Sequence, residues 1–276
     1  MNYQDWIKAA GQELLGKNIF TARLDVMVML EDVTGFDRTT ILAHPEYELT
    51  IAQERKLQNM VNKRAQHMPL AYIRGKTEFY GRDFLINKHV LEPRPESETM
   101  IELLKALEIP KNPHIIDVGS GSGALGITAG LELPDSIISL LDISKQALSV
   151  STRNAALHKL QVHILHNDLL AGLQNTYDIA LANLPYVPDG YQINKAAGQE
   201  PRIAIFGGLD GLDLYRKMFE QLQSRAKPIH YVLTESLPLQ HKELINIAQM
   251  HGYALQQTDD FIQVFINNHY PKPVIS

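Results

Sequence analysis

Residues 114–123 read His-Ile-Ile-Asp-Val-Gly-Ser-Gly-Ser-Gly, so an apolar run leads directly into a glycine-rich turn. The apolar run predicts a buried strand. Gly119, Gly121 and Gly123 let the backbone turn sharply and approach a ligand without a Cβ atom in the way. A helix is expected to begin near Gly123 and to direct its free backbone N–H groups toward that ligand. Together these features indicate a cofactor site at the carboxyl end of a strand in an open α/β sheet.

From this stretch onward, strands alternate with helices, a pattern that predicts a doubly wound, Rossmann-like α/β sheet. We expect strands near residues 114–118, 137–141, 162–165, 177–183 and 229–235. We expect helices near residues 123–132, 144–158, 210–225 and 238–251. The last two apolar runs, Tyr253–Gln256 and Phe261–Ile266, predict a terminal antiparallel hairpin.

Residues 1–75 have the periodicity of a small helical bundle. Two helical faces are formed by Trp6, Ala10 and Leu14 and by Leu57, Met60, Val61 and Arg64. A capping box at Thr50–Gln53 fits the start of the second of these helices. Nine Lys and Arg residues balance nine Asp and Glu residues in this region, which suits docking to a protein better than docking to phosphates. The alternative is a bundle that only stabilises the chain.

A short segment lies between the bundle and the sheet. Thr77–Ile86 predicts two short strands around a glycine turn. We therefore expect three parts: a helical substrate-docking domain at residues 1–75, a β-hairpin linker at 76–92, and the sheet domain at 93–276.

Composition restricts the class of protein. The chain has 276 residues, 45% of them hydrophobic, which is enough for one large domain and a small one. Its net charge of -5 does not match the basic surface of a protein that wraps nucleic acid. The chain has no cysteine, so disulfides and thiolate metal sites are excluded, and we expect no metal. Met1–Trp6 lacks the features of a signal peptide, and no apolar run approaches the ~20 residues of a membrane span. We expect a cytoplasmic monomer with no membrane partner and no stable nucleic-acid partner.

Acidic residues at the ends of the first three strands of the sheet complete the predicted cofactor site. Asp142 ends the second strand, 19 residues after Gly123, and its carboxylate can accept both hydroxyls of a ribose. Asp168 follows the third strand and can contact an adenine amino group, while Leu169 can pack on the adenine face. The charge of Asp117 suits the sulfonium of S-adenosylmethionine. The candidate cofactor-binding residues are Asp117, Gly119, Ser120, Gly121, Ser122, Gly123, Asp142, Asp168 and Leu169.

The glycine turn has a competing interpretation. Residues 121–126 read Gly-Ser-Gly-Ala-Leu-Gly and also match the dinucleotide fingerprint. The segment that discriminates is Asn183-Leu184-Pro185-Tyr186, at the end of the predicted strand 177–183, because hydride transfer does not explain it. An Asn-x-Pro-Tyr segment beside a nucleotide-like cofactor indicates a methyltransferase that acts on a planar nitrogen.

The chemistry of a planar nitrogen explains these residue types. An amide or exocyclic amine is a poor nucleophile because its lone pair is delocalised, so its N–H groups must be held and its lone pair aimed. The side-chain oxygen of Asn183 can accept one N–H. A main-chain carbonyl beside Pro185, for example that of Leu184, can accept the other, and Tyr186 can pack on the planar group. Proximity and alignment then supply most of the rate.

Several segments are similar to the motifs of one family. They are Pro69–Gly75, Glu78–Gly81, Val90–Glu98, the glycine turn, Asp142–Ser144, Asn183–Tyr186, Glu200-Pro201 and Gly207–Leu212. On these segments the chain resembles the release-factor glutamine methyltransferases of the HemK/PrmC type. The resemblance runs from about Pro69 to Leu214, and the helical region before it agrees in kind.

The resemblance implies methyl transfer from S-adenosylmethionine to the side-chain amide of the glutamine in the Gly-Gly-Gln motif of a peptide chain release factor. It implies that Asn183, Leu184, Pro185 and Tyr186 hold that glutamine and that Asn183 also contacts the cofactor. It further implies that Arg94 and Glu96 brace the wall of the active site. The alternative for these last two residues is a structural ion pair or cap.

The chain departs from the family pattern at a few positions. Leu184 stands where the family usually has a proline, and Glu92 replaces an apolar residue. Glu235-Ser236-Leu237 lacks the expected glycine after the acid, and Thr258–Val264 lacks an expected glycine and arginine. The string Asn-Leu-Pro-Tyr also occurs in ribosomal-RNA adenine dimethyltransferases. The alternatives are therefore an adenine amino methyltransferase acting on RNA or DNA, a glutamine methyltransferase of a ribosomal protein, and a non-enzymatic scaffold, against which the intact Asn183 argues.

Overall fold

The computed structural model describes residues 1–269, which form two compact units. The first unit contains Met1–Lys76 and, much later in the sequence, Ile193–Gln199. The second contains Thr77–Gln192 and the chain from Glu200 onward. The predicted sheet domain extends to residue 276, and its last seven positions, 270–276, lie outside the described residues.

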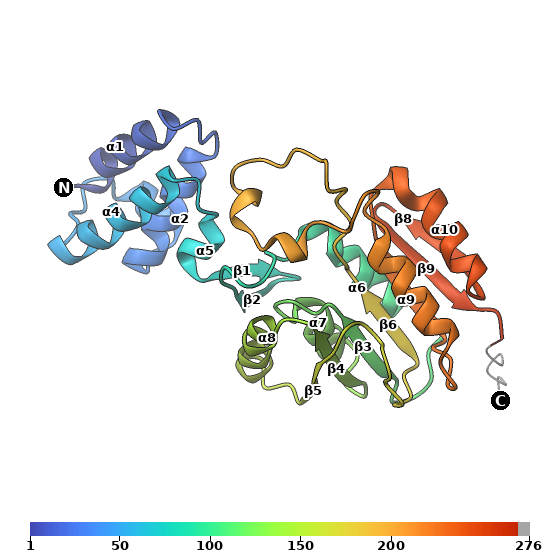
Figure 1. The fold of residues 1–276 in the computed structure, drawn as a ribbon. Helices are drawn as coiled ribbons and strands as arrows, with labels where there is room; N and C mark the ends of the chain where they lie inside the picture. The colour runs from blue at the N-terminus through green and yellow to red at the C-terminus, as the bar shows by residue number, and fades with distance from the viewer. Residues whose placement is uncertain (270–276) are drawn as a thin grey trace. The chain divides into compact units, whose positions relative to one another are not determined.

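The first unit is the predicted helical bundle (Figure 1). Its helices are α1 (Tyr3–Leu15), α2 (Ala22–Thr34), α3 (Arg38–Ala43), α4 (Ile51–Ala65) and α5 (Leu70–Arg74). Trp6 and Leu14 of α1 share one apolar core with Leu57 of α4. Arg64 lies on the inner side of α4, where its Nε donates to Asp25 Oδ2 of α2 at 2.6 Å. A guanidinium this deeply buried requires such a carboxylate partner. The predicted capping box at the start of α4 is present.

A two-stranded hairpin and a seven-stranded sheet follow the bundle. The hairpin consists of β1 (Lys76–Phe79) and β2 (Arg82–Leu85). The sheet has the order β5-β4-β3-β6-β7-β9-β8. Its parallel strands are β3 (His114–Val118), β4 (Ile137–Asp142), β5 (Val162–His166), β6 (Ile179–Ala182) and β7 (Tyr231–Glu235). The hairpin of β8 (Tyr253–Asp259) and β9 (Ile262–Asn267) adds antiparallel strands at one edge, so the predicted architecture is confirmed.

The order of the strands determines where a ligand can bind. β3 and β6 are hydrogen-bonded neighbours, although the chain passes through β4 and β5 between them. The direction of strand addition therefore reverses between β3 and β6. In open α/β sheets a crevice forms beyond the carboxyl ends of the strands at such a switch point. The glycine turn follows β3 and Asn183 follows β6, so this topology brings the two predicted motifs together.

Helices cover both faces of the sheet (Figure 1). α6 (Glu98–Lys105), α7 (Ala124–Glu132) and α8 (Lys145–Leu157) contribute to one apolar core, and α9 (Asp213–Gln223) and α10 (His241–Met250) contribute to the other. The helix expected from residue 210 begins only at Asp213, and α10 is preceded by a single 3-10 turn at Pro238–Gln240. Over residues 1–269, no helix combines the length and the apolar character that crossing a membrane would require.

Candidate active site

A cavity of about 200 Å³ lies in the second unit, at the switch point between β3 and β6. Its wall contains most of the residues that the sequence singled out: Asp117, Gly119, Ser120, Gly121, Ser122, Asp142, Asp168, Leu169, Asn183, Leu184, Pro185 and Arg94. Gly123, Tyr186 and Glu96 do not line it but lie next to residues that do. The cavity therefore joins the glycine turn to the Asn-x-Pro-Tyr segment.

The glycine turn has the backbone conformation that its sequence requires. Gly119, Gly121 and Gly123 have φ values of 73°, 54° and 82°, a region that favours glycine. The N–H groups of Gly119 and Ser120 both donate to the carbonyl oxygen of Leu141 at 2.8 Å, which ties the turn to β4. The turn is therefore held by the sheet before any ligand binds.

Asp142 occupies the predicted position at the end of β4 and is 8% exposed. Its Oδ2 accepts the N–H of Gly121 at 2.9 Å, and its Oδ1 accepts the N–H of Ser144 at 2.8 Å. Burial raises the pKa of this carboxyl, while the backbone donors oppose that shift. Each carboxylate oxygen can accept a further hydrogen bond, so the geometry leaves room for the hydroxyls of a ribose.

Asp117 sits deeper in the same wall and caps the first turn of α7. Its Oδ2 accepts the N–H of Gly126 at 2.9 Å. Burial, reinforced by the charge of Asp142, raises the pKa of Asp117 to about 7. A cationic ligand in the cavity would favour the ionised form of this group.

The outer end of the cavity contains Asp168 and Leu169. Asp168 Oδ2 lies 2.5 Å from Lys217 Nζ, and both side chains are about half exposed. Leu169 is buried and adds an apolar surface beside that carboxylate. This arrangement fits an adenine ring, which needs an apolar contact on its face and an acceptor for its amino group.

One buried hydroxyl in the wall has an unused hydrogen-bonding capacity. Within residues 1–269, Ser120 Oγ is buried without a hydrogen-bond partner, and Ser120 lines the cavity. Buried polar atoms are normally satisfied, so a polar group of a ligand is expected here. The unpaired hydroxyl, the two acidic residues and the apolar surface at Leu169 together fit S-adenosylmethionine.

Asn183 also lines the cavity and directly follows β6. Its Nδ2 donates to Ser97 Oγ and to Glu235 Oε2, each at 2.9 Å. The two acceptors are themselves 2.5 Å apart, so both lie on one side of the amide nitrogen, and flipping the amide would place its oxygen against a carboxylate oxygen. The side-chain oxygen is therefore the amide atom that remains available to a ligand in the cavity, where it can accept an N–H.

Glu235 is the centre of this hydrogen-bond network. It ends β7, beside β6, and is 1% exposed. Ser97 Oγ donates to its Oε2 at 2.5 Å, and the Tyr186 hydroxyl donates to its Oε1 at 3.0 Å. Burial raises the pKa of Glu235, the charge of Glu96 adds to that effect, and the three donors oppose it. Glu235 thus fixes the two side chains that the sequence predicted to hold a planar group.

Glu235 and Ser97 were not predicted as site residues. A sequence signal exists only for Glu235, because polar residues at the carboxyl ends of adjacent parallel strands meet at one edge of the sheet. Ser97 lies in the family-like segment Val90–Glu98, but its strand position gives no such signal, since it precedes α6 and reaches Asn183 from 86 residues away.

Leu184 shows how the chain accommodates its departure from the family pattern. Its N–H, which a proline would lack, donates to the buried hydroxyl of Tyr215 at 3.2 Å. The same hydroxyl lies 2.5 Å from the carbonyl oxygen of Glu235, so it joins the ends of β6 and β7. The Leu184 side chain is buried, and a Cβ atom placed on Gly119 would come within 3.0 Å of its Cδ2. Leu184 therefore connects the segment to the glycine turn.

Arg94 and Glu96 have different surroundings. Arg94 Nη2 lies 2.5 Å from Oε2 of the buried Glu200, and Glu200 Oε1 accepts the N–H of Glu92 at 3.2 Å. Arg94 thus braces the cavity wall through Glu200. Glu96 is exposed: burial is the main cause of the raised pKa of Glu235 and of Tyr186, and the charge of Glu96 adds to it.

Comparison with known proteins agrees with this geometry. Residues 5–75 match the family model described as the PrmC N-terminal domain, and residues 97–200 match the methyltransferase small domain. Among solved structures, the hMettl16 catalytic domain in complex with an RNA hairpin superposes with a TM-score of 0.56 at 10% identity, covering 90% of this chain and 92% of that one. The T. thermophilus 16S rRNA N2 G1207 methyltransferase, in complex with AdoMet and guanosine, gives 0.52 at 15% identity, covering 70% and 50%. These two likenesses concern the fold alone.

Curated relatives are more similar in sequence. A release factor glutamine methyltransferase of Koribacter versatilis is 34% identical over 77% of this chain and 78% of its own length. One of Deinococcus radiodurans is 30% identical over 86% and 87%, and one of Coxiella burnetii is 32% identical over 84% and 85%. On this similarity, and with the two family models matched in order along it, the chain belongs to the release factor glutamine methyltransferase family.

Proposed function

We propose that this protein transfers a methyl group from S-adenosylmethionine to the side-chain amide nitrogen of the glutamine in the Gly-Gly-Gln motif of peptide chain release factors. The observation that carries the proposal is the orientation of Asn183. Its amide nitrogen is held by Ser97 and Glu235, which leaves its oxygen available to a ligand in the cavity that Asn183 lines, and the wall of that cavity also fits an adenosyl group. The curated relatives named above supply the identity of the substrate.

The residues of this chain do two tasks in the proposed reaction. Asp142, Leu169 and the glycine turn hold the cofactor, which supplies an electrophilic methyl group when it is bound. Asn183 Oδ1 accepts one N–H of the glutamine amide, and the carbonyl oxygen of Leu184 accepts the other. With both N–H groups held, the lone pair of the nitrogen is directed along one line, and alignment supplies most of the rate.

Glu235 acts in this scheme as a positioning residue. Its two oxygens already accept hydrogen bonds from Ser97, Asn183 and Tyr186. The nitrogen becomes acidic only after it has gained the methyl group, so its proton can leave to solvent without a strong base. No residue of the network has to change its protonation state during turnover.

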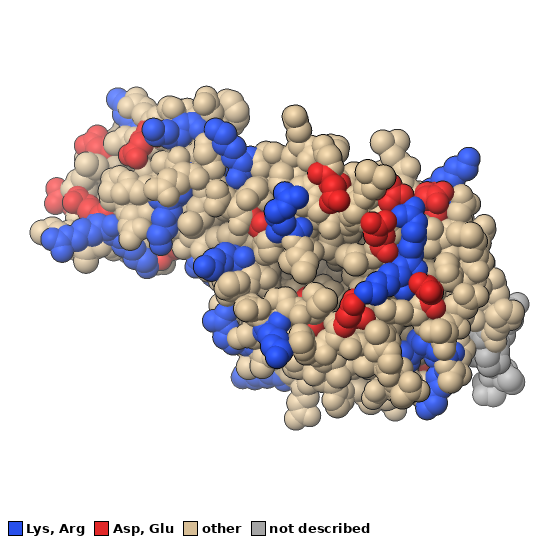
Figure 2. Space-filling model, viewed as in Figure 1, with Lys and Arg blue, Asp and Glu red and all other residues tan. Residues whose placement is uncertain are grey.

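The proposal gives the helical bundle at residues 1–75 the task of docking the folded release factor, and it treats residues 76–92 as the link to the catalytic domain at 93–276. Two features support a protein partner. Charges of both signs are interspersed over the bundle on the face that Figure 2 shows. The bundle also exposes large apolar side chains, including Phe20 at 90% and Leu24 at 52%. A surface of this kind suits a protein better than a phosphate backbone.

Three further parts of the proposal concern the setting of the reaction. We propose a cytoplasmic enzyme, since peptide chain termination takes place there. We propose that it acts as a monomer. We propose that it holds no nucleic acid stably, in line with its net charge of -5.

A labelling experiment tests the identity of the substrate. The protein would be incubated with labelled S-adenosylmethionine and, in separate reactions, with intact release factor, a ribosomal protein mixture, ribosomal RNA and DNA. The proposal expects label in the release factor, and it expects Asn183→Ala to abolish that label while cofactor binding persists. Preferential label in adenine would support a methyltransferase that acts on RNA or DNA. Label in a ribosomal protein would support a glutamine methyltransferase of that protein.

A further inference from the structure

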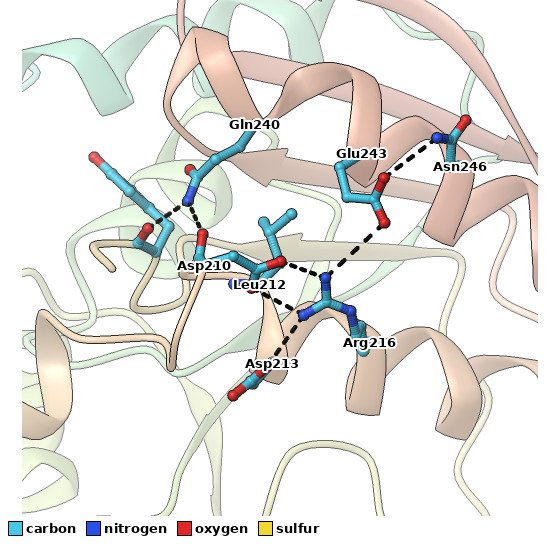
Figure 3. Close-up of polar contacts among 8 residues, drawn as sticks. Asp210, Leu212, Asp213, Arg216, Gln240, Glu243 and Asn246 are labelled. Carbon is cyan, nitrogen blue, oxygen red and sulfur yellow. Dashed lines mark hydrogen bonds and ion pairs between the residues drawn. The ribbon is translucent and has the colours of Figure 1, made fainter. Parts of the chain in front are cut away.

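Gln240 makes three hydrogen bonds, and two of them connect the Asn-x-Pro-Tyr segment to the loop that contains Asp210. It ends the 3-10 turn before α10 and is 8% exposed. Its Nε2 donates to the carbonyl oxygen of Tyr186 at 2.7 Å and to that of Asp210 at 2.8 Å (Figure 3). Its Oε1 accepts the N–H of Leu237 at 2.9 Å. Every donor of this buried amide is therefore committed to a backbone carbonyl, and the proposed mechanism uses none of these contacts.

The loop at residues 207–211 lies directly against the backbone of the same segment. A Cβ atom on Gly207 would overlap the carbonyl oxygen of Pro185, and one on Gly211 would overlap that of Tyr186. These two glycines permit a backbone-to-backbone approach that no other residue type allows. Gln240 contacts both partners of this approach through a single side-chain nitrogen.

An exposed ionic cluster surrounds the same loop (Figure 3). Arg216 of α9 pairs with Asp210 at 2.5 Å and with Asp213 at 3.0 Å, and Glu243 of α10 lies 4.0 Å away. All four side chains are at least 40% exposed. Arg216 binds both carboxylate oxygens of Asp210, so the cluster also restrains the loop at its exposed side. Gln240 makes the hydrogen bonds that join the loop to the carbonyl oxygen of Tyr186.

Tyr186 is held at both ends by these contacts. Its hydroxyl donates to Glu235 of β7, and its carbonyl accepts from Gln240, which precedes α10. The peptide groups of Leu184 and Pro185 lie between Asn183 and this fixed carbonyl. Movement of the Tyr186 carbonyl would therefore rotate the Leu184 carbonyl, which is the second acceptor in the proposed reaction.

We propose that Gln240 is a positioning residue for methyl transfer, which keeps the Leu184–Tyr186 backbone in the orientation that the target amide requires. The inference rests on the proposed function. It separates two properties of the site: binding of the cofactor, which depends on the glycine turn and Asp142, and alignment of the substrate nitrogen, which depends on Gln240. Loss of its amide leaves the partly buried carbonyls of Tyr186 and Asp210 without this donor and loosens the contact between the segment and the loop.

Two variants and one control test this assignment. Gln240→Ala removes all three hydrogen bonds. Gln240→Glu keeps the size and the acceptor for Leu237 but places a carboxylate oxygen against the two carbonyls. Gln249→Ala is the matched control, because Gln249 is an exposed glutamine on α10. For each protein, calorimetry gives the affinity and stoichiometry for S-adenosylmethionine, and steady-state kinetics on intact release factor gives kcat and KM.

The expected result is a fall in kcat of about 10- to 100-fold for Gln240→Ala, since misalignment of about 1 Å can cost about 100-fold. Gln240→Glu should be at least as slow, because repulsion replaces attraction. Cofactor affinity should stay within about twofold, and the control should match the wild type, so that the loss is confined to turnover. Rates are normalised to the amount of bound cofactor, which removes any unfolded fraction.

Three outcomes would decide against the inference or its basis. Wild-type kcat in Gln240→Ala would show that the carbonyl of Tyr186 needs no donor. Loss of cofactor binding in both variants, in parallel with kcat, would make Gln240 a purely structural residue and overturn the assignment. Absence of methyl transfer to release factor by the wild type itself would remove the proposed function instead, so the two failures are distinguishable.

Discussion

Replacing Asn183 by Asp exchanges the amide nitrogen at the centre of the candidate site for an oxygen. Asn183 Nδ2 lies 2.9 Å from Glu235 Oε2, so in Asn183→Asp two carboxyl groups face each other in a buried place. At 2.9 Å and an effective dielectric constant of about 20, two full charges repel by about 6 kcal/mol. One pKa unit corresponds to only about 1.4 kcal/mol, so the pair is expected to share one proton near neutral pH.

The shared proton restores part of the original arrangement. A protonated carboxyl at position 183 donates to Glu235, as the amide did, and presents its carbonyl oxygen to the target nitrogen. Burial already raises the pKa of Glu235, the charge of Glu96 raises it further, and the donors from Ser97 and Tyr186 lower it. The active form is thus the protonated pair. Activity should be present below its raised pKa and should be lost as pH rises through it.

The assay is the initial rate of methyl transfer to intact release factor across the neutral pH range, for the wild type, Asn183→Asp and Asn183→Ala. The Ala variant has no acceptor and should lose about 100-fold or more at every pH. The Asp variant should exceed the Ala variant at the acid end and approach it at the alkaline end. A constant ratio between the two variants over the whole range would rule out the shared proton, and near-normal turnover by Asn183→Ala would place the acceptor elsewhere.

Three other predictions concern separate parts of the molecule. Asp142→Ala should weaken binding of S-adenosylmethionine by roughly 1.5–3 kcal/mol, because charge-assisted hydrogen bonds to a ribose are lost. Unchanged affinity by calorimetry would remove Asp142 from the site, and tight NADH binding would overturn the assignment of S-adenosylmethionine as the cofactor. Gly211→Ala should destabilise the fold by about 1–3 kcal/mol in urea unfolding, since its φ is 82° and the added Cβ would overlap the Tyr186 carbonyl oxygen. Gly190→Ala is the control, because no atom lies within 4 Å of the Cβ added there. An isolated Gly-Gly-Gln peptide should be methylated far more weakly than intact release factor, because it lacks remote contacts and must be ordered at about 1–2 kcal/mol per residue; equal rates would make residues 1–75 a stabilising appendage.

The fold was predictable because its signals are local. The apolar run before Gly119 and the positive φ values of the glycine turn belong to adjacent residues, and they define β3 and the start of α7. Asn183 was recognisable because it ends a buried strand beside a proline. For such elements, periodicity and turn chemistry carry the information, and the alternation of strands and helices indicates a doubly wound sheet without giving the order of its strands.

The supporting residues of the site were not predictable in the same way. Ser97 and Glu235 reach Asn183 from 86 and 52 residues away, and Gln240 reaches Tyr186 from 54. Each contact exists only after the sheet has assembled. The late start of α9 has the same origin: residues 207–211 stay in a loop because their glycines pack on the Pro185 and Tyr186 carbonyls.

Fragment mass spectrometry of the product tests whether the oxygen of Asn183 aligns a glutamine amide for methylation. Intact release factor would be incubated with S-adenosylmethionine and the protein, then digested and sequenced in the spectrometer. We expect a single added methyl group on the side-chain nitrogen of the Gly-Gly-Gln glutamine, present with the wild type and absent with Asn183→Ala. A methyl group on any other residue, or one that persists with Asn183→Ala, would show that Asn183 does not perform this alignment.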